Sequence, residues 1–138
     1  MSYAGDITSR EAWDILAADP RAVLVDVRTE PEWSFVGVPN LQPLDRSPVC
    51  VSWQGYPDMA VNASFADDLI SHGVSPDRPV LLLCRSGQRS RFAAEALTAL
   101  GYETCFNVAD GFEGPPDDRH HRGATAGWKA SGLPWIQG

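Results

Sequence analysis

Cysteine is the side chain in this sequence with the strongest potential as a nucleophile, and one of the three cysteines has unusual neighbours. Cys84 precedes the run Arg-Ser-Gly-Gln-Arg-Ser, so it lies among basic and polar residues in a chain of formal net charge −7. The thiolate is the nucleophilic form, and nearby cations and helix N-termini lower the thiol pKa. The guanidinium groups of Arg85 and Arg89 also suit a tetrahedral oxyanion. The pattern predicts a reactive thiolate that attracts a small anion.

The residues on either side of Cys84 predict a strand before it and a helix after it. The run 79–83 is apolar, as in strands that are buried on both faces. The run 89–100 repeats apolar residues at helical spacing and ends before a glycine, with one face formed by Phe92, Ala93, Ala96, Leu97 and Leu100. Open α/β sheets bind ligands at the carboxyl ends of their strands, where Cys84 is expected.

The connection between this strand and this helix is predicted to hold an anion. N–H groups at a helix N-terminus lack helical partners and can point at an anion, and the helix dipole adds partial positive charge. A short loop that curls around one atom gathers such N–H groups into a nest. Gly87 permits a backbone conformation that a side chain would oppose.

The rest of the chain alternates helical and strand patterns, which indicates a parallel sheet. Capping boxes at Thr8 with Glu11 and at Thr29 with Glu32 open two predicted helices, the first of which ends near residue 18. Further helices are expected at 62–72 and 125–130, strands at 22–27, 49–51 and 104–108, and an exposed loop at 113–124. We expect an α/β domain with helices on both faces of a parallel sheet, forming three layers.

Length and composition narrow the class of protein. The 138 residues fit a single domain spanning 1–138, and 43% hydrophobic with 21% charged residues is typical of a globular protein. The acidic balance argues against a nucleic-acid partner. No apolar run suggests a membrane-spanning helix, and the N-terminus lacks a secretory signal pattern, so a cytoplasmic location is expected.

Several other reactive residues have more ordinary interpretations. Cys50 and Cys105 lie in apolar, strand-like runs, where free cysteine usually packs as a small hydrophobic residue. His120 and His121 have no acidic or cysteine partner at a recognised ligand spacing, so we expect a solvated loop and no metal site there.

The segment 47–62 is open to two interpretations. Its Trp53, Tyr56 and Met59 either overhang the site and shape acceptor access, or pin a surface loop to the domain.

Four separated motifs make the sequence resemble a rhodanese domain of the single-domain sulfurtransferase type. The first is Asp26-Val27-Arg28 with Glu32-Trp33, and the strongest is the loop from Cys84 to Ser90. The third and fourth are Asn107-Val108 with 111–114, and the C-terminal run 127–135. One departure is the segment 36–39, Val-Gly-Val-Pro, where many members carry His-Ile-Pro.

The resemblance implies a mechanism. Cys84 would attack the outer sulfur of a small anionic donor such as thiosulfate, carry it as a persulfide, and pass it to a thiol or to cyanide. A protein could also act as sulfur donor or acceptor. The resemblance implies no metal and no organic cofactor. It assigns Cys84 as nucleophile and the following residues to substrate binding, with the two arginines as anion ligands: Arg85, Ser86, Gly87, Gln88, Arg89 and Ser90.

Other functions remain open at this point. Related phosphatases and arsenate reductases use the same thiolate, but their loops carry one more residue between the cysteine and the arginine. Cys84 and Arg89 are separated by four residues, and this shorter loop suits a single sulfur atom better than a phosphoryl group. A non-catalytic persulfide carrier or regulatory module would share the fold.

Overall fold

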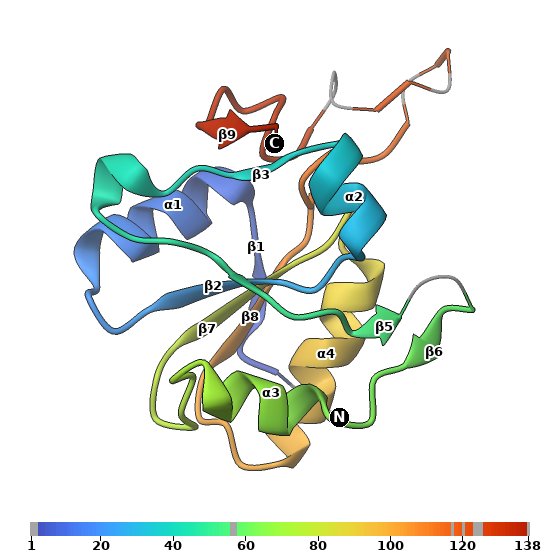
Figure 1. The fold of residues 1–138 in the computed structure, drawn as a ribbon. Coiled ribbons are helices and arrows are strands. Elements are labelled where there is room, and N and C mark those ends of the chain that lie inside the picture. The colour runs from blue at the N-terminus through green and yellow to red at the C-terminus, as the bar shows by residue number, and fades with distance from the viewer. Residues whose placement is uncertain (1–2, 56–57, 117, 120, 123–125, 138) are drawn as a thin grey trace.

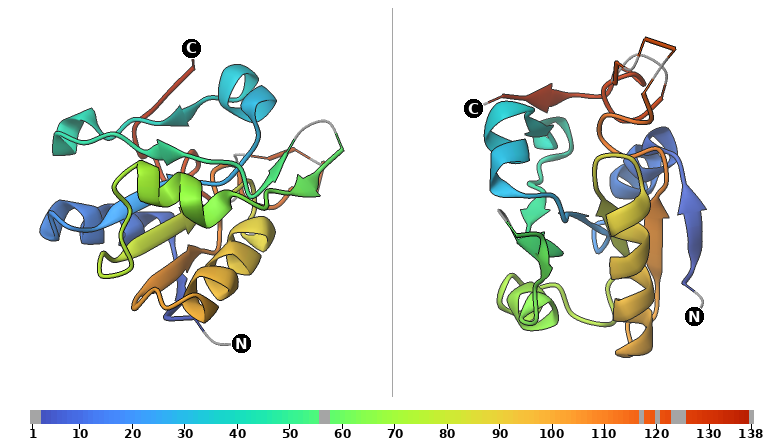
Figure 2. Two further views of the ribbon diagram at one scale, coloured as in Figure 1. Left: turned by 60° about the horizontal axis from the view of Figure 1, so that its bottom comes forward. Right: turned by 90° about the vertical axis from the view of Figure 1, so that its right-hand side faces the viewer.

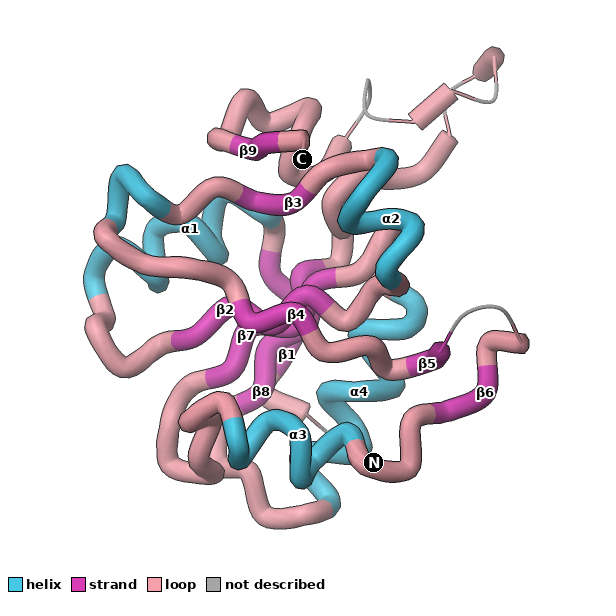
Figure 3. The backbone as a smooth tube through the Cα atoms, in the orientation of Figure 1, coloured by secondary structure: helices cyan, strands magenta, loops and turns pink. Residues whose placement is uncertain are grey.

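A five-stranded parallel sheet forms the centre of the protein. The computed structural model describes residues 3–55, 58–116, 118–119, 121–122 and 126–137. The strand order is β1 (Gly5–Ile7), β8 (Cys105–Val108), β7 (Val80–Leu83), β2 (Val23–Asp26) and β4 (Val49–Cys50). Each neighbouring pair in this order is parallel. Figures 1 and 3 show these strands gathered in the middle of the molecule.

Helices cover both faces of this sheet, so the predicted three-layer α/β architecture is confirmed. On one face, α3 (Phe65–Ser71) and α4 (Gln88–Ala99) bury Leu69 and Leu97 against Val25 and Leu82. On the other face, α1 (Ser9–Ala18) buries Leu16 against a separate apolar cluster. Figure 2 shows α4 running alongside β8, against which it packs. Successive strand residues point to opposite faces, which explains the continuous apolar runs.

The two predicted capping boxes are present. The Thr8 side chain accepts from the backbone N–H of Glu11, and the Glu11 carboxylate accepts from the N–H of Thr8. At the start of α2 (Glu30–Phe35), the Glu32 carboxylate accepts from the N–H of Thr29 over 3.2 Å and from its hydroxyl over 3.0 Å. Each box satisfies N–H groups that a helix start leaves without partners.

Short elements account for most of what the sequence did not predict. β3 (Val38–Pro39) pairs antiparallel with β9 (Trp135–Ile136), and β5 (Gln54–Gly55) pairs antiparallel with β6 (Ala60–Val61). A 3₁₀ turn, η1, spans Gln42–Leu44. Elements of two or three residues are too short to show a hydrophobic period.

Two sequence-based expectations are wrong in detail. The last helix, expected at 125–130, is absent from the described residues of that segment: 126–132 form bends and turns, and Thr125 lies outside the described residues. On α4, Phe92 is 45% exposed and Leu100 64% exposed. Ala93 and Leu97 of the predicted face are buried as expected, and Ala94 and Ser90 complete the buried face of the helix. Among the described helices, none has the length and apolar character that a bilayer-spanning segment needs.

Candidate active site

Cys84 lies directly after β7, at the carboxyl edge of the sheet where the sequence predicts it. The carboxyl end of β2 lies beside it, since Asp26 is in register with Leu83. The chain then turns into α4, whose N-cap residue is Gly87. The strand, the turn and the helix N-terminus therefore meet at the sulfur.

Two hydrogen-bond donors of this turn reach the Cys84 sulfur. The backbone N–H of Gly87 donates to Sγ over 3.1 Å, and the Ser90 Oγ lies 3.2 Å from Sγ. The sulfur faces the loop, and the residue is nevertheless only 1% exposed, because its other side joins the apolar cluster beneath α4. An amide and a hydroxyl donor therefore both point at the sulfur, where they can bond a negatively charged group.

The backbone of Gly87 requires glycine. Its φ is +101°, and a Cβ built on it would lie 2.2 Å from the carbonyl oxygen of Ala109. On the same side, the N–H of Phe112 donates to the Cys84 carbonyl over 2.8 Å, and the N–H of Gly114 donates to the Arg85 carbonyl over 3.0 Å. The segment 109–114 therefore supports the loop from behind and fixes its curvature.

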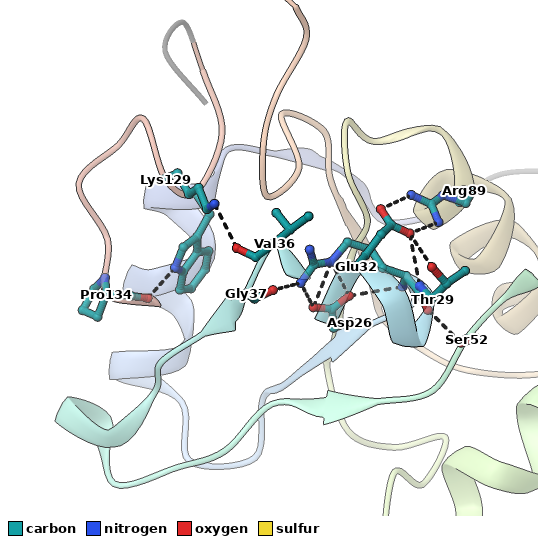
Figure 4. Close-up of polar contacts among 11 residues, drawn as sticks. Asp26, Thr29, Glu32, Val36, Gly37, Ser52, Arg89, Lys129 and Pro134 are labelled. Atoms are coloured by element: carbon teal, nitrogen blue, oxygen red, sulfur yellow. Dashed lines mark hydrogen bonds and ion pairs between the residues drawn. The ribbon is translucent and has the colours of Figure 1, made fainter. Parts of the chain in front are cut away.

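The Arg89 side chain forms an ion pair with the carboxylate of Glu32 in α2. Its two terminal nitrogens bond both oxygens of Glu32 over 2.7 and 2.9 Å, as Figure 4 shows. The sequence indicates Glu32 as a capping-box residue, and in the structure its carboxylate also lies at the site and holds the predicted anion ligand. Part of the guanidinium is therefore already occupied, and the positive charge of the loop is partly balanced.

This ion pair also shifts the pKa values of Glu32 and Arg89. Burial alone would raise the pKa of Glu32, but hydrogen bonds from Arg89 and Thr29 outweigh it and hold that pKa below its ordinary value. The hydrogen bond to Glu32 raises the pKa of Arg89 further. The side chains of Arg89 and Glu32 are 17% and 19% exposed, so the pair is only weakly screened by solvent.

The remaining predicted loop residues differ in exposure. Arg85 and Gln88 are exposed, and Ser86 is half-buried. The exposed guanidinium of Arg85 is therefore the more available cation of the loop for an incoming anion, whereas Arg89 is held inside.

A buried ion pair lies beneath the same edge of the sheet. Arg28 and Asp26 are both fully buried and bond through two nitrogens and two oxygens, and Arg28 also donates to the Gly37 carbonyl over 2.7 Å. The Arg28 guanidinium lies over the Phe112 ring, 4.3 Å from its centroid. The pair has a structural role, because it ties β2 to the chain before β3 and to the segment that supports the loop.

The other two cysteines are poor nucleophiles. Burial raises the pKa of Cys50 to about 12, with a further contribution from the Asp26 charge. Burial also raises the pKa of Cys105, which lies inside β8. Both were predicted to be packing residues, and their positions in the sheet agree with that prediction.

Within the described ranges, no group of three or more histidine, cysteine or acidic side chains could hold a metal ion. His121 belongs to these ranges, whereas His120 lies outside the described residues.

The segment 47–62 contributes β4 and the β5–β6 pair. Its Trp53 packs edge-on against Phe65 of α3, with ring centroids 5.2 Å apart, which favours the interpretation of a pinned loop. Met59 is 37% exposed, and Tyr56 lies outside the described residues.

Comparisons with known proteins agree with this geometry. Residues 4–138 match the family described as the STR4 middle domain. The crystal structure of Rv0390 from M. tuberculosis superposes with a TM-score of 0.89 at 52% identity, over 99% of this chain and 100% of that one. An uncharacterized protein of Rickettsia conorii is 38% identical over 136 residues, which are 94% of this chain and 95% of that protein.

A relative whose name states an activity has a lower sequence identity to this chain. The thiosulfate sulfurtransferase GlpE of Actinobacillus succinogenes is 28% identical over 129 residues, which are 94% of this chain and 87% of that protein. Proteins named for a rhodanese-like domain are also among the matches.

Proposed function

Since this chain belongs to the family of the STR4 middle domain and has the rhodanese-like fold, we propose that it is a sulfurtransferase that carries sulfur as a persulfide on Cys84. The donor we propose is a small anion such as thiosulfate, and the acceptor is a thiol or cyanide. The observation that carries the proposal is the pair of donors at the Cys84 sulfur, the Gly87 N–H and the Ser90 hydroxyl.

The reaction proceeds in two half-reactions. The Cys84 thiolate attacks the outer sulfur of thiosulfate, a new S–S bond forms, and the old S–S bond breaks to release sulfite with its electron pair. The acceptor anion then attacks the terminal sulfur of the persulfide, and the Cys84 thiolate leaves. No proton, oxidant or reductant is consumed in either half-reaction when the acceptor is cyanide.

The loop supports each half-reaction through charge. Cys84 is anionic both when it attacks and when it leaves, and the donors at its sulfur stabilise it in both roles. The exposed Arg85 supplies positive charge for the approaching anion. Because the Cys84 residue is only 1% exposed, neighbouring side chains have to move aside for the donor to reach it.

Turnover with thiosulfate and cyanide tests this function. Wild-type protein is expected to form thiocyanate, and Cys84→Ser is expected to form none. The matched control is Cys105→Ser, the same substitution at a buried cysteine in the neighbouring strand, which should retain turnover. Absence of thiocyanate with wild type, or turnover by Cys84→Ser, would reject the proposal. Hydrolysis of an aryl phosphate that depends on Cys84 would instead favour phosphatase chemistry.

A further inference from the structure

Asn107 of β8 bonds both of the residues whose donors reach the Cys84 sulfur, Gly87 and Ser90. Its side-chain nitrogen donates to the Gly87 carbonyl over 3.1 Å and to the Asp6 carboxylate over 3.1 Å. Its carbonyl oxygen accepts from the Ser90 hydroxyl over 2.5 Å. Asn107 is 3% exposed, and its place in a motif does not by itself indicate a role.

The orientation of the Asn107 amide is fixed by its partners. The Gly87 carbonyl and the Asp6 carboxylate only accept hydrogen bonds, so they must face the amide nitrogen, which has two hydrogens to give. The amide oxygen therefore faces Ser90. This leaves Ser90 between two acceptors, Asn107 Oδ1 at 2.5 Å and Cys84 Sγ at 3.2 Å.

A serine hydroxyl has one hydrogen and cannot donate to both acceptors fully. When Cys84 is a neutral thiol, Ser90 donates to Asn107, and the thiol hydrogen can point at the Ser90 oxygen. When Cys84 is a thiolate, the charged sulfur is the stronger acceptor, and the Ser90 hydrogen turns toward it. A turn of the hydrogen toward the sulfur breaks the short bond to Asn107, so the two acceptors compete for it.

We propose that Asn107 is a positioning residue that competes with the Cys84 sulfur for the Ser90 hydrogen, so that Ser90 donates to the sulfur only while the sulfur is anionic. The proposal rests on the proposed function of Cys84. In that reaction the sulfur is anionic as nucleophile and as leaving group, and it is neutral while it is bonded to the transferred sulfur. The competition therefore directs the Ser90 hydrogen to the sulfur at the two steps that need it.

A coupling experiment tests this competition. The pH dependence of Cys84 alkylation by iodoacetamide, followed on the peptide that contains it, gives the thiol pKa without any sulfur donor. Ser90→Ala is measured in the wild-type and in the Asn107→Leu backgrounds. We expect Ser90→Ala to raise the pKa by about one pH unit in wild type and by about two in Asn107→Leu, where the sulfur has no competitor. Equal or smaller shifts in the Asn107→Leu background would overturn the proposal.

A second background protects the test against misfolding. Asn107→Ala removes the same acceptor for the Ser90 hydrogen without adding a larger side chain to the core, so Ser90→Ala should again raise the pKa more than in wild type. An equal or smaller shift in that background would contradict the competition. The hydroxyl control on the same helix is Thr98→Val, which removes a bond to the Ala94 carbonyl and should leave the Cys84 pKa unchanged.

The charged groups around this end of the sheet are the same in both members of each pair of measurements. They are Arg89 with Glu32, Asp26 with Arg28, and Asp6 behind Asn107. Each pair of measurements in one background shares them, so the difference reports Ser90 alone. If wild type takes no sulfur from thiosulfate yet shows the expected coupling, the proposed function fails and the hydroxyl competition stands. If it takes sulfur and the shifts are equal, only the competition fails.

Discussion

Substituting Gly87 by alanine tests whether the sulfur-binding loop is held in its curve by close backbone contact. Gly87 and Gly101 both have a φ of +101°, and they flank the two ends of α4. A Cβ at Gly87 would lie 2.2 Å from the Ala109 carbonyl oxygen, whereas a Cβ at Gly101 would meet nothing within 4 Å. Gly101→Ala is therefore a control with the same backbone strain and no clash.

The two substitutions differ in the expected loss of stability. A left-handed backbone costs a residue with a side chain about 1–2 kcal/mol, and this applies to both. The gain from a less flexible unfolded chain also applies to both and cancels in the comparison. Relief of the clash at Gly87 requires the loop or the segment 109–114 to shift, which costs about 2–3 kcal/mol more.

Urea unfolding monitored by tryptophan fluorescence measures this difference in the free energy of unfolding. Gly87→Ala should lose about 3–4 kcal/mol and Gly101→Ala about 1 kcal/mol, with unchanged dependence on urea. Cys84 alkylation at neutral pH should slow only in Gly87→Ala, since the Gly87 N–H then moves away from the sulfur. Equal losses of stability in the two variants would refute the reasoning.

Three further substitutions test the charges at the site. Glu32→Gln should destabilise the protein by about 1–2 kcal/mol at pH 7; because the folded-state pKa of Glu32 is depressed, this difference from wild type should begin to shrink as the pH falls below the unfolded-state pKa of about 4.3 and vanish only below the lower folded-state pKa. A difference that does not shrink in acid contradicts it. Asp26→Asn should cost about 3–5 kcal/mol in urea unfolding because it leaves a buried guanidinium unpaired, while Asp77→Asn, at an exposed ion pair, should change the free energy of unfolding little. Arg89→Ala should raise the Cys84 pKa measured by alkylation and weaken the use of thiosulfate, whereas Arg91→Ala on the exposed side of α4 should change the pKa less.

Local sequence patterns predict the elements that position Cys84. The apolar run that became β7 and the spacing that became α4 are both continuous in the chain, and a thiol between them has to lie at the carboxyl edge of a parallel sheet. The need for glycine at position 87 was predicted for the same reason, because a sharp turn from strand to helix demands an unusual backbone.

Contacts between distant segments could not be predicted in this way. Glu32 has the spacing of a capping box, and that interpretation is correct, but nothing local shows that its carboxylate also meets Arg89. Asn107 lies in a strand whose pattern indicates burial, and its partners Gly87 and Ser90 come from another element. Such partners are set by the packing of helix against sheet, which one stretch of sequence does not contain.

Formation of the persulfide can be measured without any acceptor, from the mass of the intact protein after brief exposure to thiosulfate and removal of the excess. Wild type and Cys105→Ser should each gain one sulfur atom, Cys84→Ser should gain none, and cyanide should remove the added sulfur. An unchanged mass for wild type, or a sulfur atom gained by Cys84→Ser, would contradict a persulfide on Cys84.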